Sequence, residues 1–253
     1  MTYTRYISLQ DRAVFITGGG SGIGASVVEA FVANGARVAF ADIQDDESQV
    51  LAERLATLGP KPLFLRCDLT DIPALRAAIA TATEELGTIG VLVNNAGNDQ
   101  RQTVDDITPE SWDRSQALNL KHLFFAAQAV RPGMRKLGGG AIVNFSSVAW
   151  MLGATNMAAY SAAKAGIVGL TNSLARELGE DNIRVNAIAP GAVVTERQRR
   201  LWLSPADEEL YKSRQCLHRT LDANHIARAV LFLASDDSAM ISKQCLVVDG
   251  GLH

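Results

Sequence analysis

Short apolar runs alternate with longer helical patterns along the whole chain, and this alternation constrains the fold more than any other feature of the sequence. Runs typical of buried strands occupy residues 13–17, 37–41, 63–66, 91–94, 141–145, 183–188 and 245–248. Helical patterns lie between them, at residues 23–34, 46–58, 72–86, 109–137, 158–179 and 222–235, and a polar helical stretch covers 196–215. Seven strands with helical crossovers predict a parallel sheet whose two faces are both covered by helices.

Size and charge narrow the classes of protein to which the chain can belong. Its 253 residues contain no linker-like or low-complexity stretch, so residues 1–253 are predicted to form a single domain. The net charge of −3 gives no electrostatic case for binding nucleic acid. No apolar run reaches the roughly 20 residues that a membrane-spanning helix needs, and residues 1–10 lack the apolar centre of a signal peptide. A cytoplasmic protein is therefore expected.

Cysteine and histidine residues show no pattern typical of metal binding. The three cysteines are scattered along the chain, and the four histidines form no His-Glu-x-x-His pair. Isolated cysteines are usually small, buried apolar residues. We therefore expect no metal site.

A glycine-rich segment, residues 17–24, lies directly between the first predicted strand and the first predicted helix. Glycines there let the backbone turn tightly and approach a pyrophosphate, and the helix N-terminus supplies free N–H groups with a partial positive charge. A flexible loop without a ligand is the alternative. Because the segment stands at the strand-to-helix junction, it predicts a dinucleotide-binding site.

Asp42 ends the second predicted strand, where a carboxylate can accept hydrogen bonds from an adenosine ribose and would repel a 2′-phosphate. Residues 41–47 contain four acidic side chains and no basic one, and Arg37 is the only basic residue between Thr17 and Gln44. The sequence therefore favours NAD over NADP. A solvated turn residue is the alternative for Asp42.

Two further strand ends carry candidate cofactor contacts. Asp68 follows the third strand, where it can meet the adenine amino group, although Asp is also a common helix N-cap. Residues 94–97, Asn-Asn-Ala-Gly, end the fourth strand; their small side chains leave room for a ribose, and their amides can link neighbouring strands. A simple turn is the alternative for this second segment.

Tyr160 and Lys164 stand four residues apart in a predicted helix, so they lie on the same helix face. A free phenol has a pKa of about 10 and is a poor base at neutral pH. A nearby ammonium group favours the phenolate and is expected to lower the pKa of Tyr160. The pair therefore indicates an acid/base site, with a solvated helix face as the alternative.

Taken together, these segments resemble the short-chain dehydrogenase/reductase family over essentially the whole chain. The glycine-rich segment, Asp68, residues 94–97 and the Tyr160–Lys164 pair match in order and spacing, as do Asn119, residues 146–147, residues 190–191 and residues 248–251. The resemblance implies a three-layer, doubly wound Rossmann fold of class α/β. It also implies a nicotinamide cofactor and a reaction at a CH–OH group.

The resemblance implies four catalytic residues. Ser147 would bond the substrate oxygen, Tyr160 would act as the acid/base, and Lys164 would bind the nicotinamide ribose and lower the pKa of Tyr160. Asn119 would hold a water that passes the proton on, with a local helix distortion as its alternative. The implied cofactor contacts are Gly18, Ser21, Gly22, Ile23, Gly24, Asp42, Ile43, Asp68, Leu69, Asn95, Ala96, Gly97, Tyr160, Lys164, Pro190, Gly191, Val193 and Thr195.

Several segments around the implied site are similar to those of bacterial aldose 1-dehydrogenases of the D-xylose type. They comprise residues 95–99, 144–150, 195–198 and 215–217. This subgroup oxidises C1 of a pentose or hexose to the lactone with NAD. The substrate contacts expected on this basis are Asn98, Ser147, Trp150, Asn156, Tyr160, Gln198 and Trp202.

Other activities share the same motifs. A 3-oxoacyl thioester reductase, docked to an acidic carrier through Arg197, Arg199 and Arg200, is the main alternative, followed by a polyol or secondary-alcohol dehydrogenase. A nucleotide sensor without catalysis is disfavoured because all four implied catalytic residues are kept. Residues 196–215 are expected to form a substrate lid. The helices that begin at Pro109 and Ala158 resemble the family's dimer-forming elements, which implies a homotetramer.

Overall fold

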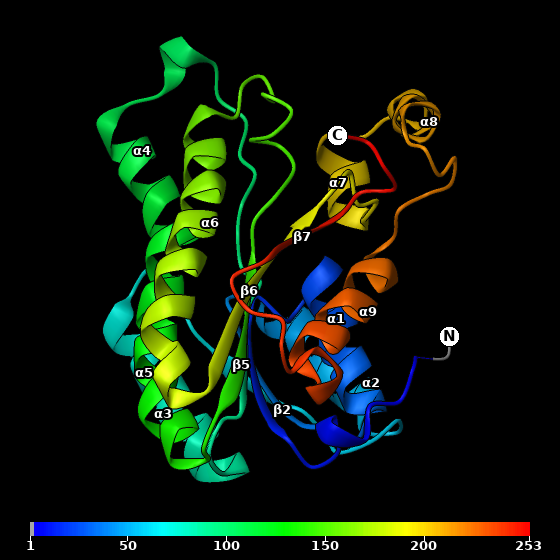
Figure 1. The fold of residues 1–253 in the computed structure, drawn as a ribbon. Coiled ribbons are helices and arrows are strands. Elements are labelled where there is room, and N and C mark those ends of the chain that lie inside the picture. The colour runs from blue at the N-terminus through cyan, green and yellow to red at the C-terminus, as the bar shows by residue number, and fades with distance from the viewer. Residues whose placement is uncertain (1–2) are drawn as a thin grey trace.

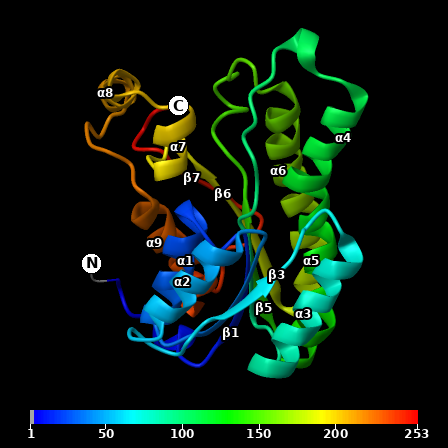
Figure 2. The same ribbon diagram turned by 180° about the vertical axis from the view of Figure 1, so that it is seen from behind.

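Seven parallel strands form one sheet in the order β3-β2-β1-β4-β5-β6-β7 in the computed structural model, which describes residues 3–253 (Figures 1 and 2). The strands are β1 (Ala13–Thr17), β2 (Arg37–Asp42), β3 (Leu63–Arg66), β4 (Val91–Asn94), β5 (Gly140–Phe145), β6 (Ile183–Pro190) and β7 (Cys245–Val248). The reversal of strand order between β1 and β4 is the switch point of a doubly wound fold, where the carboxyl ends of the strands leave a crevice. The predicted α/β fold with a seven-stranded parallel sheet is confirmed.

The strands at the centre of the sheet are apolar because helices cover them on both sides. All five residues of β1 are buried, as are the four of β4. Thr17 pairs in register with Ala41 of β2 and Asn94 of β4, so the three strands end at the same edge. The segments that follow these strands therefore meet at one place, which is where the candidate site lies.

Helices α1 (Gly22–Ala33), α2 (Asp45–Leu55) and α9 (Ala223–Ala234) cover one face of the sheet (Figure 1). Their apolar residues form one core cluster with the strands, including Val28, Phe31 and Val230. Asp222 caps α9 by accepting hydrogen bonds from the N–H groups of Asn224 and His225.

Helices α3 (Ile72–Leu86), α5 (His122–Lys136) and α6 (Ala158–Leu178) cover the opposite face, with α4 (Pro109–Gln116) beside α6 (Figures 1 and 2). The helix predicted over 109–137 is present as an unbroken helical run from Pro109 to Lys136. Within it, a π-helical segment that the pattern did not predict, η3 (Ala117–Lys121), lies between α4 and α5. Insertions of this kind widen one turn and occur frequently at functional sites.

The polar stretch expected over 196–215 consists of two helices, α7 (Glu196–Leu201) and α8 (Pro205–Arg214). Thr195 and Ser204 cap them by accepting hydrogen bonds from the N–H groups of Gln198 and Asp207. Both helices lie beyond the carboxyl end of the sheet, as expected for a segment that could cover a site there (Figure 1).

Short 3₁₀ turns complete the fold: η1 (Ile7–Leu9), η2 (Val104–Asp106), η4 (Gly179–Asp181) and η5 (Asp236–Ser238). Within residues 3–253, no helix is long and apolar enough to cross a membrane. The same residues contain no group of three or more His, Cys, Asp or Glu side chains that could hold a metal ion.

Candidate active site

The glycine-rich loop is packed too tightly for larger residues at key positions. A Cβ atom on Gly24 would lie 1.8 Å from the carbonyl oxygen of Gly18, so the first turn of α1 closes directly on the loop. Gly18 has a φ of +68°, which other residues rarely adopt. Asn95 holds the loop from β4 by donating its Nδ2 hydrogens to the carbonyl oxygens of Thr17 (3.1 Å) and Gly18 (2.7 Å).

The N-terminus of α1 is suited to an anion. Ser21 is the N-cap residue, but its side chain makes no capping hydrogen bond; instead its Oγ accepts one from Gln44 Nε2 at 3.0 Å. The first N–H groups of a helix need partners from outside the helix. The N–H groups at the start of α1, which include those of Gly22, Ile23 and Gly24, are therefore well placed for a pyrophosphate.

Asp42 is nearly buried, with 7% of its surface exposed, so the alternative of a solvated turn residue is wrong. Its Oδ2 accepts the N–H of Gly20 at 2.8 Å, and its Oδ1 accepts those of Ile43 (2.8 Å) and Gln44 (3.1 Å). The carboxylate therefore links the glycine-rich loop to the end of β2 by hydrogen bonds. The sequence predicted Asp42 only as a ribose contact and did not indicate this structural role.

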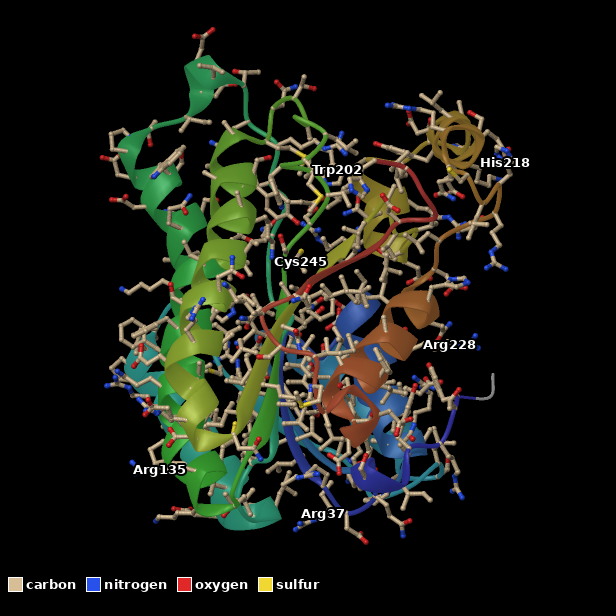
Figure 3. All side chains as sticks on the ribbon, in the orientation of Figure 1. Arg37, Arg135, Trp202, His218, Arg228 and Cys245 are labelled. Carbon is tan, nitrogen blue, oxygen red and sulfur yellow. The ribbon has the colours of Figure 1, made fainter. Side chains whose placement is uncertain are left out.

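Two arginines bear on the choice between NAD and NADP. Arg37 is fastened at the opposite end of the sheet, where its Nε donates to the Asp11 carbonyl at 3.1 Å; Figure 3 shows it at the end of the molecule away from Trp202. Arg66, which sequence reasoning missed, pairs in register with Asp42 and forms a 2.8 Å ion pair with Asp45. A cation that is already paired thus lies at the same end of the sheet as Asp42.

The residues expected to meet adenine lie beside one another at the ends of β2 and β3. Asp68 is exposed, and hydrogen bonds from the Thr70 hydroxyl and N–H hold the pKa of its carboxyl below the ordinary range. It is not a helix N-cap, because Asp71 caps α3. Leu69 is buried, whereas Ile43 is 64% exposed and offers an apolar surface of the kind that an adenine ring covers.

Tyr160, Ser147 and Lys164 come together where β5 ends and α6 begins. Lys164 is only 3% exposed, so the alternative of a solvated helix face is wrong. Its Nζ donates to the Phe145 carbonyl at 2.7 Å and lies 5.5 Å from the centre of the Tyr160 ring. Ser147 forms a side-chain hydrogen bond with Tyr160.

The expected lowering of the Tyr160 pKa is wrong for the protein alone. Burial raises the pKa of Tyr160 to about 12, and the hydrogen bond with Ser147 and the positive charge of Arg197 only partly oppose this. Asp99 raises it further. Burial also lowers the pKa of Lys164 to about 8, against the opposing effect of Asp99. Desolvation therefore has the largest effect on the pKa of both groups.

Asn119 lies in the π-helical segment, so the local distortion considered for it is present. Its side chain makes two hydrogen bonds to the backbone of Asn98 and one to Ser115 Oγ at 3.3 Å.

His122, close to Asn119 in the sequence, was missed by sequence reasoning. It is fully buried, and burial together with the charge of Lys164 lowers its pKa to about 3, although interactions with the backbone of Leu118 and Ala117 oppose this.

The two serines after β5 have different surroundings. Ser146 is buried, donates to the Lys164 carbonyl at 2.7 Å and accepts from Trp150 Nε1 at 3.2 Å. Ser147 accepts the N–H of Ala149 at 3.1 Å and faces Tyr160. Trp150, expected in the substrate site, is thereby anchored to Ser146.

The segment after β6 reaches back to the glycine-rich loop. Gly191 donates its N–H to the Val248 carbonyl at 3.0 Å, and a Cβ there would lie 2.6 Å from Asp249 Cβ. Val193 is buried, and Thr195 Cγ2 is 3.7 Å from the position of a Cβ on Gly22. Thr195, the N-cap of α7, and Gly22, at the start of α1, therefore lie next to each other in the fold, although they are 173 residues apart in the sequence.

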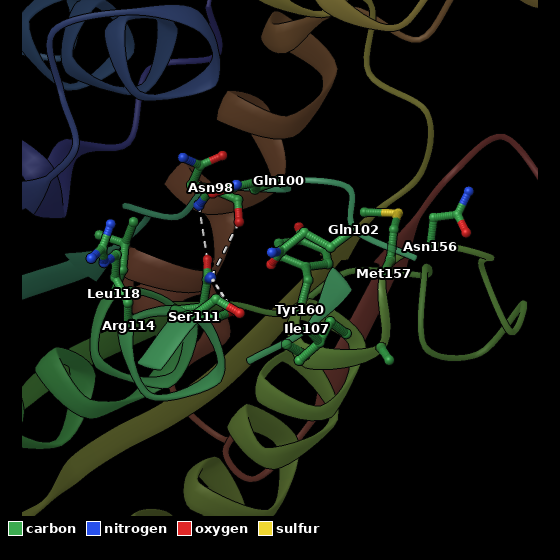
Figure 4. Close-up of a pocket in the computed structure, with 14 residues that line it drawn as sticks. Asn98, Gln100, Gln102, Ile107, Ser111, Arg114, Leu118, Asn156, Met157 and Tyr160 are labelled. Atoms are coloured by element: carbon green, nitrogen blue, oxygen red, sulfur yellow. Dashed lines mark hydrogen bonds between the residues drawn. The ribbon is translucent and has the colours of Figure 1, made fainter. Parts of the chain in front are cut away.

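A cavity of about 110 Å³ opens beside Tyr160 between α4, the loop after β4 and the start of α6 (Figure 4). The polar residues that line it are Asn98, Gln100, Gln102, Ser111, Arg114, Ser115, Asn119, Asn156 and Tyr160. Of the expected substrate contacts, Asn98, Asn156 and Tyr160 are therefore together. Ser147, Trp150, Gln198 and Trp202 are not among the described residues that line this cavity.

Known proteins are similar to this chain over nearly its whole length. Residues 18–253 match the sequence model of a family described as "Enoyl-(Acyl carrier protein) reductase". A Rhizobium meliloti (strain 1021) protein named "Probable galactose dehydrogenase GalD" is 53% identical over 250 residues, 98% of each chain. The D-xylose 1-dehydrogenase of Caulobacter vibrioides (strain NA1000 / CB15N) is 45% identical over 251 residues, 99% of each chain. A solved 7α-hydroxysteroid dehydrogenase, complexed with NADH and 7-oxo glycochenodeoxycholic acid, has a TM-score of 0.93 and 34% identity over 99% of this chain and 98% of that one.

Proposed function

Because the chain belongs to the short-chain dehydrogenase/reductase family and is an oxidoreductase acting on CH–OH groups, we propose that it oxidises C1 of an aldose to the lactone with NAD. The polar cavity beside Tyr160 carries this proposal, since five carboxamide side chains line it: Asn98, Gln100, Gln102, Asn119 and Asn156. Carboxamides donate and accept hydrogen bonds, which suits the hydroxyl groups of a sugar. The two relatives named for galactose and D-xylose support the same substrate class.

Tyr160 is the proposed base, and its neighbours prepare it. Ser147 bonds the hydroxyl that reacts and is already hydrogen-bonded to Tyr160. Bound NAD supplies the hydride acceptor and a positively charged ring. Tyr160 takes the hydroxyl proton as the C1 hydrogen leaves as hydride. Lys164, whose Nζ is fixed by the Phe145 carbonyl, holds the nicotinamide ribose and adds positive charge behind the phenol.

We propose that the residues around the crevice hold NAD. Glycines at 18, 22 and 24 would let the backbone approach the pyrophosphate, the start of α1 would provide N–H donors, and Asp42 would bind the adenosine ribose. Asp68, Leu69 and Ile43 would contact the adenine. Residues 95–97 would contact the nicotinamide ribose, and the nicotinamide amide would be bound by Pro190, Gly191, Val193 and Thr195. Asn119 passes the proton from Lys164 toward solvent through a water.

The lid segment, residues 196–215, contributes a further donor to the sugar. Trp202 Nε1 is buried and has no hydrogen-bond partner among the described residues, while Arg101 lies over the Trp202 ring at 4.7 Å. A buried indole N–H usually has a partner, so a sugar hydroxyl is a suitable one. Gln198 and Trp150 complete the substrate contacts that we propose.

A thioester reductase finds less support in the lid. Two of the three arginines considered for docking an acidic carrier are engaged within the chain, Arg197 with Asp99 at 2.6 Å and Arg199 with Glu208 at 2.7 Å. Their charges are therefore largely compensated.

One assay distinguishes these activities. The purified protein is incubated with D-galactose, D-xylose, polyols or 3-oxoacyl thioesters, with NAD or NADP, while the absorbance of the reduced nicotinamide and the formation of lactone are followed. We expect reduction of NAD by aldoses with lactone as product. Tyr160→Phe should lower kcat by about 10²- to 10⁴-fold, the usual contribution of general acid–base catalysis. Turnover of thioesters with NADPH alone would refute the proposal.

We also propose a homotetramer that works in the cytoplasm. Trp112 of α4 and Phe124 of α5 are each 39% exposed and lie on the helices expected to form a dimer contact. Large exposed aromatic side chains of this kind are typical of interfaces. Light scattering coupled to size exclusion measures the mass directly, and Trp112→Glu should reduce it.

A further inference from the structure

The first turn of α7 is attached to the loop after β4 by charged hydrogen bonds. Arg197 donates to Asp99 Oδ1 at 2.6 Å and to Asn98 Oδ1 at 2.8 Å. Gln198 donates to Asp99 Oδ2 at 2.8 Å, so both carboxylate oxygens of Asp99 are bound by adjacent residues of α7. The Asp99 side chain is only 14% exposed. The Arg197 side chain is 38% exposed. Losing either partner leaves the other charge uncompensated.

The same two charges act on Tyr160. Asp99 disfavours the phenolate and raises the pKa of Tyr160, whereas Arg197 lowers it. Lys164 lies on the same helix as Tyr160, with His122 behind it, and Arg114 of α4 lines the cavity that Tyr160 borders. Of these groups, only Arg197 is carried by the lid segment. Movement of α7 therefore moves one charge, that of Arg197, relative to the Tyr160 phenol and leaves the other named charges in place.

We propose that Asp99 and Arg197 are positioning residues that couple closure of the lid to deprotonation of Tyr160. With the lid closed, Arg197 offsets the effect of Asp99 on the phenol. With α7 withdrawn, Asp99 loses its counter-ion and favours the protonated form of Tyr160 more strongly. This inference rests on the proposed role of Tyr160 as the base, and it assigns to the lid a control over when that base is available.

The mechanism follows from the opposite signs of the two charges. A positive charge and a negative charge near a phenol shift its pKa in opposite directions. Removing Arg197 therefore leaves the carboxylate uncompensated, while removing the charge of Asp99 leaves the guanidinium uncompensated. A latch that only held the lid in place would respond to both losses in the same way.

The test compares Asp99→Asn, Arg197→Gln and the double variant with the unaltered enzyme. The pH dependence of kcat/KM is measured, and the ionisation of Tyr160 is followed by ultraviolet difference titration in protein saturated with the nicotinamide nucleotide that it binds. The matching Tyr160→Phe variants provide the baseline. We expect Asp99→Asn to titrate Tyr160 about one pH unit lower, Arg197→Gln about one unit higher and the double variant near the unaltered enzyme.

Gln198→Ala is the matched control, because it removes a hydrogen bond to Asp99 from the same helix turn without changing a charge. We expect it to raise KM and leave the titration unchanged. Asp99 also favours the charged form of Lys164. Asp99→Asn therefore changes the ionisation of Lys164 as well as that of Tyr160, and both affect the pH dependence of kcat/KM. The absorbance of the phenolate reports on Tyr160 alone and so distinguishes the two ionisations.

The coupling would be overturned if the Tyr160 titration shifted in the same direction in Asp99→Asn and Arg197→Gln. It would also be overturned if these variants raised KM without any shift of the Tyr160 titration. Failure of the proposed function has a different signature. An enzyme that oxidises no aldose but still shows opposite shifts in the phenolate titration would retain the coupling and lose the substrate assignment.

Discussion

Asn119 holds the peptide backbone of Asn98 from both sides. Its Oδ1 accepts the Asn98 N–H at 2.8 Å, and its Nδ2 donates to the Asn98 carbonyl at 3.2 Å. The bonds fix the loop that carries Asp99 to the π-helical segment η3. A residue expected from the sequence to serve a water therefore also sets the position of the loop that meets the lid.

The first prediction concerns this contact. Asn119→Ala removes both hydrogen bonds and leaves two backbone groups of Asn98 without partners, which costs about 1–3 kcal/mol of unfolding free energy. KM for the sugar should rise because the loop with Asn98 and Asp99 loosens. Asn98→Ala is the control for stability, since it keeps the backbone bonds and loses only side-chain contacts, with Arg197 and with the proposed sugar. Equal stability of the two variants in urea unfolding would contradict the role of Asn119.

Gly24 is predicted to tolerate no side chain. A Cβ would lie 1.8 Å from the Gly18 carbonyl, so Gly24→Ala must displace the glycine-rich loop. Overpacking of this kind costs about 1–3 kcal/mol, and NAD affinity should fall as well. Gly169→Ala in α6 is the control, because no atom lies within 4 Å of the added Cβ. Calorimetric unfolding and titration with NADH measure both effects; unchanged affinity in Gly24→Ala would argue against the cofactor assignment of the loop.

Asp42 is predicted to exclude NADP by its charge. Asp42→Asn keeps a hydrogen-bond acceptor for the loop but removes the repulsion of a 2′-phosphate, which then lies near Arg66. The ratio of kcat/KM for NAD to that for NADP should fall by about tenfold or more, the effect of roughly 1.4 kcal/mol. Asp45→Asn is the control, because it frees Arg66 from its ion pair and leaves Asp42 intact. If Asp45→Asn lowered the ratio of kcat/KM for NAD to that for NADP as much as Asp42→Asn does, the exclusion of NADP would not come from the charge of Asp42.

His122 is predicted to make the fold sensitive to acid. Burial, with a smaller effect of Lys164, lowers its pKa from 6.5 to about 3, so the unfolded chain binds a proton in this interval and the folded chain does not. Stability contributed by neutral His122 is therefore present above pH 6.5 and lost as the pH falls. Relative to His122→Leu, the protein should lose about 2 kcal/mol between pH 6.5 and pH 5. Chemical unfolding at several pH values measures this difference; parallel curves would contradict it.

Strand and helix patterns could be predicted because they depend on local periodicity. The apolar run over Ala13–Thr17 and the glycines that follow it require a buried strand and a tight turn wherever they occur. The four-residue spacing of Tyr160 and Lys164 likewise places them on one helix face. The π-helical segment around Asn119 was not predictable, because an apolar helical pattern continues through it and the extra residue is accommodated by packing.

The sequence by itself thus determined the parallel sheet, the glycine-rich loop at its edge and the nearness of Tyr160 to Lys164, since each depends on residues close together in the chain. Only the tertiary structure determined which charged residues lie around the Tyr160 phenol. Asp99 and Arg197, 98 residues apart, meet only when the lid folds over the loop after β4, and Arg66 reaches the end of β2 through strand pairing. Burial then reversed the expected direction of the Tyr160 pKa, because desolvation depends on everything that surrounds a group and not on its neighbours in sequence.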